Sequence, residues 1–525
     1  MDPVDNEKTF RLAKPVKKGL LRLVFSRFLI IAALLVLEVL LMVGVIRWLK
    51  PYIPYLTVLQ TVFVLAMVLY LFNNSMSTFA KLTWMLIIAV LPVPGTLLLL
   101  FVQTNLGHRA IQRRVEQLVQ DTKAAIPQDP AVLDSLHRDG DGTDDLARYL
   151  SRSGCFPIYS GTETTYYPSG EDAFAAMLEA VETTKEYIFL EFFIIEEGYM
   201  WGKLLETLIR KASEGVDVRV MYDGMCELNK LPFGYTKLLR EHGIAAKTFA
   251  PIIPVLSSHY NYRDHRKILV IDGHTAFTGG VNLADEYINR SSPFGHWKDT
   301  ALRLRGRAVR SFTLLFLQMW NIEETEPKFS PWTEREVPAP DGSSGFVMPY
   351  GDCPLDSDRV GETVYIDMLY RATDFVHIMT PYLILDSEMK TALQYAAERG
   401  VDVSMILPGV PDKKIAYALA KSHYAALIDA GVKIYEYTPG FVHAKVWLSD
   451  DEKAVVGTVN LDYRSLYHHF ECAVYLYKTD SLPAIEADFQ NTLLRCRRVT
   501  PETVKAEKAY YKIIGWLAKF IAPLM

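Results

Sequence analysis

The chain has 525 residues, of which 50% are hydrophobic and 22% charged, and a formal net charge of -5 at pH 7. This length exceeds one ordinary domain, and the composition indicates a globular part joined to an apolar region. The negative charge argues against a dedicated nucleic-acid binder, because such proteins carry a basic domain. The 5 cysteines show no metal-ligand spacing, so we expect neither a metal centre nor another cofactor.

The N-terminal region, residues 1–105, contains apolar segments at about residues 28–46, 55–72 and 82–102. About 20 apolar residues suffice for a helix to cross a bilayer, so these segments predict transmembrane helices and a multi-pass protein of the cell membrane. Buried core helices are the alternative, which the length of the segments disfavours. A Pro-x-Pro-Gly break in the third segment would let that segment dip into the membrane and return.

Basic residues on the two sides of the apolar region favour different topologies. The basic residues before the first segment place the N-terminus in the cytoplasm. These residues are Lys8, Arg11, Lys14, Lys17, Lys18, Arg22 and Arg27. Three complete spans would then leave the remainder outside, whereas Arg109, Arg113 and Arg114 favour the cytoplasm after the third segment. The number of true spans and the side that the rest of the chain faces therefore stay open.

After a connecting region at residues 106–150, the chain repeats one pattern of strands alternating with amphipathic helices. The strand candidates at residues 215–223 and 400–408 both begin with Gly-Val-Asp-Val. Such an alternation predicts an α/β fold with mixed sheets flanked by helices. We expect a first lobe at residues 151–325 and a second at residues 345–500.

Two further segments complete the expected organisation. Residues 326–344 contain 4 prolines and 4 acidic residues and predict a linker between the lobes. Residues 501–525 predict an amphipathic helix, whose apolar face holds Tyr510, Ile513, Ile514, Leu517 and Ile521. This helix either packs on the globular part or lies on a surface of anionic lipid.

Each copy contains the same constellation of residues. The first consists of His265, Lys267, Asp272, Gly279, Gly280 and Asn282, and the second of His443, Lys445, Asp450, Gly457, Thr458 and Asn460. Both place lysine 2, aspartate 7, glycine 14, a small residue 15 and asparagine 17 positions after the histidine. Two such matches at equivalent places of a duplication are not accidental.

The residue types in this constellation favour chemistry at a phosphodiester. Histidine and lysine two positions apart on a strand point to the same face, so both reach one site. One histidine can attack phosphorus while the other protonates the leaving oxygen. Lysine and asparagine donate to phosphate oxygens, and glycine or another small residue lets the backbone approach them (Asn282, Asn460, Gly280 and Thr458). The lysines offset the developing charge, so no metal is needed.

The doubled motif resembles the signature of the phospholipase D superfamily, and the resemblance covers most of residues 150–500. It implies two pseudo-symmetric α/β lobes with one active site at their interface. It also implies that the aspartates of the motif, Asp272 and Asp450, are chiefly structural. Spacing alone does not tell which histidine attacks, but the resemblance favours His265 as the nucleophile and His443 as the acid.

Members of this superfamily also place a carboxylate behind each histidine to fix its tautomer, as outer groups do around metal-bound histidines. Glu471, which follows His443 by 28 residues, is implied as the partner of His443. Asp299, in a Trp-x-Asp context, is the candidate partner of His265. The remaining histidines, His469 among them, are interpreted as surface or packing residues. Tyr382 is interpreted either as lining the cleft or as a core tyrosine.

Within the superfamily, residues 81–101, 279–288 and 380–386 resemble bacterial cardiolipin synthases. This resemblance implies an enzyme of the bacterial inner membrane that joins two phosphatidylglycerol molecules into cardiolipin and glycerol through a phosphatidyl-histidine. Its partners would be these phospholipids and no nucleic acid, and the sequence does not indicate protein partners. Many members have only two N-terminal apolar segments, so the segment at residues 28–46 is a departure.

Other activities use the same residues. Phospholipid hydrolysis and other phosphatidyl transfers, phosphatidylserine synthesis for example, need the same histidines and lysines. A phosphodiesterase acting on nucleic acid shares the motifs but would be expected to lack the apolar segments and to carry a basic groove. A non-catalytic membrane scaffold would have no reason to keep both constellations.

Overall fold

The structure is a computed structural model, which describes residues 10–13, 36, 40, 44, 53–74, 76, 78–103, 108–122, 124–154, 156–251, 262–356 and 358–522. The chain divides into two compact units. The larger takes in residues 111–251 and 261–516, and the smaller contains most of the chain up to residue 110. The larger unit contains both copies of the motif.

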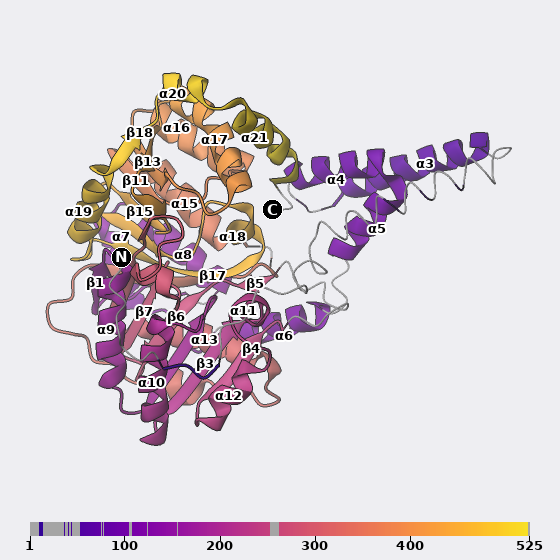
Figure 1. Ribbon diagram of the computed structural model, residues 1–525. Coiled ribbons are helices and arrows are strands. Elements are labelled where there is room, and N and C mark those ends of the chain that lie inside the picture. Colours follow the sequence, from indigo (N-terminus) through magenta and orange to yellow (C-terminus); the bar gives the residue numbers. More distant parts are fainter. Residues whose placement is uncertain are drawn as a thin grey trace, which may run out of the picture. The chain divides into compact units, whose positions relative to one another are not determined.

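The first copy forms a mixed 7-stranded sheet with the order β1-β9-β7-β6-β2-β3-β4 (Figure 1). Its strands are β1 (Thr162–Tyr167), β2 (Tyr187–Phe192), β3 (Asp217–Asp223), β4 (Ala245–Phe249), β6 (Lys267–Ile271), β7 (Thr275–Gly279) and β9 (Ala301–Gly306). The neighbours β2, β3 and β4 are parallel, and the other pairs are antiparallel. Its helices are α9 (Gly170–Glu182), α10 (Tyr199–Ser213), α11 (Met225–Asn229), α12 (Tyr235–Glu241), α13 (Val309–Trp320) and α14 (Ser330–Thr333), with 3-10 turns η3 (Asp285–Ile288) and η4 (Asn321–Glu323).

The second copy repeats this arrangement in a 9-stranded sheet with the order β10-β17-β16-β15-β11-β12-β13-β18, to which β5 adds beside β17. Its strands are β10 (Phe346–Asp352), β11 (Phe375–Met379), β12 (Asp402–Pro408), β13 (Lys433–Tyr437), β15 (Val446–Ser449), β16 (Lys453–Gly457), β17 (His469–Tyr477) and β18 (Cys496–Arg498). Its helices are α15 (Val360–Arg371), α16 (Ser387–Glu398), α17 (Lys414–Asp429), α18 (Tyr463–Tyr467), α19 (Leu482–Leu493) and α20 (Pro501–Ala506). The predicted α/β fold with two lobes of mixed sheet is confirmed.

The central strands are apolar along their whole length because both faces of each sheet are covered. Every residue of β6 and of β16 is buried. Three helices precede the first sheet: α6 (His108–Asp121), α7 (Pro130–Asp139) and α8 (Thr143–Gly154). Several of their apolar residues join a core cluster that also contains residues of both sheets.

Two short pairings cross between the copies, and they position the site. Strand β8 (His296–Lys298), from the first copy, pairs in parallel with β14 (Gly440–Val442), which directly precedes His443. Conversely, β5 (Arg263–Asp264), which directly precedes His265, pairs in parallel with the start of β17. Each motif histidine therefore follows a strand that is hydrogen-bonded to the other lobe.

The smaller unit contains the helices α3 (Ile53–Phe72), α4 (Thr78–Val90) and α5 (Pro92–Gln103), with a small core of Leu71, Trp84, Ile88 and Leu99. Within the residues that the structure describes, no helix has both the length and the hydropathy needed to cross a membrane. The predicted segment 28–46 lies outside the described residues, except for Val36, Leu40 and Gly44. The C-terminal helix α21 (Ala509–Ile521) exposes Tyr510, Ile513, Trp516 and Leu517.

Candidate active site

Both motif histidines lie at the junction of the lobes, and the backbone holds them there. The His265 N–H donates to the carbonyl of Phe470 at 2.9 Å, and the His443 N–H donates to the carbonyl of Lys298 at 2.7 Å. Both side chains are buried. The charges of His443 and Lys445 contribute to the pKa of His265, as expected of groups that share one site.

Each histidine has a carboxylate on Nδ1, and the partners are the reverse of those that the sequence predicts. Nδ1 of His265 lies 2.9 Å from Glu471 Oε2, and Nδ1 of His443 lies 2.7 Å from Asp299 Oδ2. The predicted pairs, Glu471 with His443 and Asp299 with His265, are wrong. The reason is the crossed strands: Asp299 directly follows β8, and Glu471 lies in β17, so each carboxylate is delivered to the histidine of the other lobe.

This pairing leaves Nε2 of each histidine for a substrate. A nitrogen that faces a carboxylate carries the ring proton, so the other nitrogen has the free lone pair. Burial and the neighbouring Lys267 lower the pKa of His265 well below its usual value. Burial and Lys445 lower the pKa of His443 to about 4, although Asp299 opposes them. Both imidazoles are therefore neutral near pH 7.

The two carboxylates differ in their electrostatics. Burial raises the pKa of Glu471 well above its usual value, although Lys267 opposes it. Burial also acts on Asp299, but the charge of His443 and its hydrogen bond overcome that effect and lower the pKa of Asp299. Asp299 is thus the better partner for a protonated imidazole.

The motif lysines lie directly beside their histidines. Lys267 Nζ donates to the carbonyl of His265 at 2.5 Å, and Lys445 Nζ lies 2.9 Å from Nδ1 of His443. Burial lowers the pKa of Lys267 to about 8 and that of Lys445 to about 7. A bound phosphate would favour their charged forms, since an anion within a few ångströms raises the pKa of an ammonium group.

The motif asparagines have different surroundings. Asn282 accepts a hydrogen bond from the N–H of Ile194 at 3.0 Å and donates to the hydroxyl of Tyr287 at 2.8 Å. The Oδ1 atom of Asn460 is buried and has no hydrogen-bond partner. Their binding of a phosphate stays a prediction.

The small residues of the motif contact the carboxylates. A Cβ atom at Gly280 would lie 2.0 Å from Oδ1 of Asp299, so only glycine leaves room for that side chain. The hydroxyl of Thr458 donates to Glu471. Their predicted binding of a phosphate stays a prediction.

Each motif aspartate directly follows a strand: Asp272 follows β6, which begins at Lys267, and Asp450 follows β15, which begins one residue after Lys445. Asp272 accepts hydrogen bonds from the N–H groups of Lys185, Glu186 and Tyr187, at the start of β2. Asp450 binds the start of β11 in the same way, through the N–H groups of Thr373, Asp374 and Phe375. Neither aspartate is bonded to a motif histidine, and both hold the sheet together.

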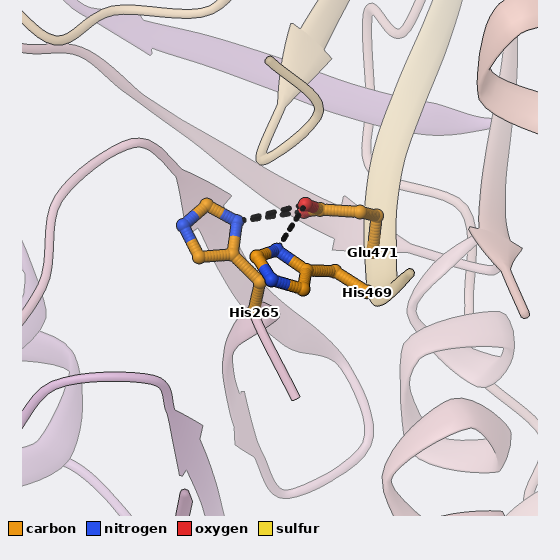
Figure 2. A group of neighbouring side chains, drawn as sticks. All are labelled: His265, His469 and Glu471. Atoms are coloured by element: carbon orange, nitrogen blue, oxygen red, sulfur yellow. Dashed lines mark hydrogen bonds and ion pairs between the residues drawn. The ribbon is translucent and has the colours of Figure 1, made fainter. Parts of the chain in front are cut away.

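His469, interpreted from the sequence as a surface or packing residue, lies beside the nucleophile candidate (Figure 2). Its ring centroid is 5.4 Å from that of His265, and its Nδ1 is 3.7 Å from Oε1 of Glu471. Trp297 takes the equivalent position in the other half, with its ring centroid 5.3 Å from that of His443. Both residues could have been predicted from the sequence, because each lies two residues before the carboxylate and so on the same face of its strand.

Aromatic side chains extend the site on the side of His443. The rings of Phe441 and His443 lie 5.9 Å apart, and Tyr382 lies 6.4 Å from Phe441. The Tyr382 hydroxyl donates to Asp412 at 2.6 Å. Tyr382 is therefore near the site and reaches it through Phe441.

Two mixed-sheet lobes whose histidine–lysine motifs meet at one site define a phospholipase D-like protein. The profile of the family described as "Cardiolipin synthase, PLD-like domain" matches residues 177–295 and 365–493. A solved structure, phosphatidylserine synthase of Haemophilus influenzae, has the same fold, with a TM-score of 0.54 and 15% identity over 73% of this chain and 97% of that one.

Whole-chain relatives define the family more closely. The chain is 32% identical to a cardiolipin synthase of Alkalihalophilus pseudofirmus, over 90% of this chain and 94% of the relative. It is 54% identical to an uncharacterized protein of Streptococcus mutans, over 87% of this chain and 99% of that protein. The chain belongs to the cardiolipin synthase family, a family of phosphatidyltransferases.

Proposed function

We propose that this protein transfers a phosphatidyl group from one phosphatidylglycerol molecule to another and so forms cardiolipin and glycerol. The observation that carries the proposal is the pair of buried histidines, each with a carboxylate on Nδ1, flanked by two lysines. A reaction in two steps at one phosphate needs one nucleophile, one proton donor that later becomes a base, and cations for the oxygens.

In the first step, Nε2 of His265 attacks phosphorus and the bond from phosphorus to the glycerol oxygen breaks. His443, after taking up a proton when the anionic lipid binds, gives it to that oxygen. The electrostatics support this division of roles. Asp299, with its lowered pKa, supports a cationic His443. Glu471 lies 2.9 Å from Nδ1 of His265 and so keeps the lone pair of that histidine on Nε2.

In the second step, the hydroxyl group of another phosphatidylglycerol attacks the phosphatidyl-histidine. His443 takes the proton of that hydroxyl, an oxygen–phosphorus bond forms, and the bond from phosphorus to Nε2 of His265 breaks. Lys267 and Lys445, together with Asn282 and Asn460, stabilise the charge on the phosphate oxygens in both steps. The lysines carry out this role without a metal ion.

We also propose that the protein works as a multi-pass protein of the bacterial cell membrane. The support is the sequence, with apolar segments at residues 28–46, 55–72 and 82–102, and the exposed apolar side chains of α3, among them Val58, Leu65 and Leu69. Both substrates lie in the bilayer, so a tethered enzyme meets them at a higher effective concentration.

The test is product analysis with the full chain in phosphatidylglycerol vesicles. We expect equal amounts of cardiolipin and free glycerol, measured by lipid mass spectrometry and an enzymatic glycerol assay. Phosphatidic acid as the sole lipid product would identify a hydrolase instead. A matched reaction with the His265→Asn variant controls for contaminating lipases.

A further inference from the structure

Three side chains converge beside the nucleophile candidate: His265, His469 and Glu471 (Figure 2). Oε1 of Glu471 lies 2.9 Å from Nδ1 of His265 and 3.7 Å from Nδ1 of His469. One potential ligand atom from each residue lies within 4.8 Å of the other two. In the described part of the chain, this is the one group of histidine, cysteine, aspartate and glutamate side chains with such a spacing.

One nitrogen of this cluster is buried and has no hydrogen-bond partner among the described residues, namely Nδ1 of His469. Its neighbour Glu471 is engaged by other groups, because both carboxylate oxygens lie 2.9 Å from Nδ1 of His265 and Oε2 accepts from Thr458. Buried polar atoms nearly always have a partner, so an imidazole nitrogen without one, 3.7 Å from a carboxylate oxygen, indicates a place for a ligand.

The chemistry of the cluster suits a transition-metal ion. Two imidazole nitrogens and one carboxylate oxygen are ligands that Zn²⁺ takes at about 2.0–2.2 Å, often with a water molecule in the fourth position. Tetrahedral bonds of that length place the ligand atoms about 3.3 Å apart, and Oε1 of Glu471 lies 2.9 and 3.7 Å from the two Nδ1 atoms. Mg²⁺ prefers oxygen ligands alone, so it does not fit the two imidazoles.

The half of the site around His443 can be compared with the half around His265. There, Trp297 occupies the position of His469, so His443 and Asp299 have no third ligand beside them. Any metal binding should therefore be confined to the half that carries His265.

We propose that His265, His469 and Glu471 form an inhibitory site for Zn²⁺ or a similar divalent transition-metal ion. The ion binds the lone pair of Nδ1 of His265, so the ring proton of the neutral imidazole must move to Nε2. Because Nε2 is the atom proposed to attack phosphorus, the metal-bound histidine has no lone pair for the reaction. The inhibitory effect rests on the proposed function, whereas the binding of the ion does not.

The experiment measures metal binding and catalysis separately, on the detergent-solubilised full chain. Co²⁺ serves as the probe for binding, because its visible absorption reports coordination by nitrogen and oxygen ligands. Zn²⁺ and Mg²⁺ are then added to the activity assay in phosphatidylglycerol micelles, and EDTA is used to reverse any effect. The variants are His469→Asn, His265→Asn and His443→Asn, each checked for folding by circular dichroism.

We expect the wild type to bind one Co²⁺ and to lose most of its activity in micromolar Zn²⁺, with recovery in EDTA and no loss in equal Mg²⁺. His469→Asn should lose Co²⁺ binding and Zn²⁺ sensitivity while its turnover stays within about tenfold of the wild type. His443→Asn should lose activity yet still bind Co²⁺, and His265→Asn should lose both.

Three results would overturn the proposal: no Co²⁺ spectrum with the wild type, an unchanged spectrum with folded His469→Asn, or a spectrum lost in His443→Asn. Failure of the proposed function would look different. Wild-type protein that makes no cardiolipin but binds Co²⁺ through His469 would reject the function and keep the metal site.

Discussion

The two halves of the active site are built alike and differ in their details. Each combines a histidine from one lobe with a carboxylate from the other, but the half around His265 has Glu471 and His469, whereas that around His443 has Asp299 and Trp297. Of the two carboxylates, only Asp299 has a lowered pKa, which suits it to lie beside a histidine that must carry a proton. In the proposed mechanism, this difference lets a near-symmetric duplication supply one nucleophile and one acid.

The largest effects should come from the histidines themselves. Replacement of either His265 or His443 by alanine should lower cardiolipin formation by at least about 10³-fold, because each removes a reacting group. A phosphatidyl ester of p-nitrophenol separates their roles, because its leaving group needs no proton. His443→Ala should then release a burst of one nitrophenolate per enzyme and hold the phosphatidyl group on His265, as measured by rapid quench and mass spectrometry.

His265→Ala is the matched control and should give no burst. An adduct on His443 in that variant would invert the assignment of roles, although the reaction in two steps would stand. If neither histidine carried the label, direct transfer between the lipids would replace the covalent mechanism.

The carboxylates provide the next test. Glu471→Gln and Asp299→Asn keep the shape of the side chain but remove its charge, and each should lower turnover by about 10–100-fold. With the nitrophenyl ester, Asp299→Asn should leave the rate of the burst nearly unchanged, because His443 is not needed as an acid there. Glu471→Gln should slow the burst, because it orients His265.

Equal effects of both substitutions on the burst would contradict the crossed pairing. The reversed pattern, in which Asp299→Asn slows the burst and Glu471→Gln does not, would return Glu471 to His443, as the family resemblance implies.

The smallest effect concerns the lysines and pH. In the free enzyme, Lys445 has a pKa of about 7 and Lys267 one of about 8, both lowered by burial. A rise in pH removes these protons and with them the cations that stabilise the phosphate, so kcat/KM should fall from about pH 7, by at least about tenfold at pH 9. Lys445→Arg keeps its charge, so its decline should begin only near pH 8.

Lys267→Arg is the control and should leave the decline near pH 7. A profile that is flat from pH 6 to 9 in the wild type would show that the lysines stay charged throughout and that solvent reaches them in the free enzyme.

The fold follows from the sequence more readily than the site does. The repeated alternation of apolar strands with amphipathic helices predicts two α/β lobes, and the family comparison and the sheets confirm that fold. Apolar strands and identical offsets are local properties of the chain. The predicted transmembrane helices remain a prediction.

The pairing of histidine and carboxylate could not be predicted in the same way. Glu471 lies 206 positions from His265, and Asp299 lies 144 positions from His443. The pairs depend on β5, β8 and β14, which have 2 or 3 residues each and therefore no readable periodicity. Spacing along the chain favours, for each histidine, the carboxylate of its own lobe. The pairing of the short strands instead places the carboxylate of the other lobe beside it.

The crossed strands also bear on how such a protein could have arisen. A single lobe carries a histidine and a carboxylate, but it directs them to different half-sites. Two identical copies related by a twofold axis would complete each other, since each would supply its carboxylate to the histidine of its twin. A gene fusion of such a dimer would keep both half-sites intact from the start, and the two copies would then be free to diverge into a tryptophan on one side and a histidine on the other.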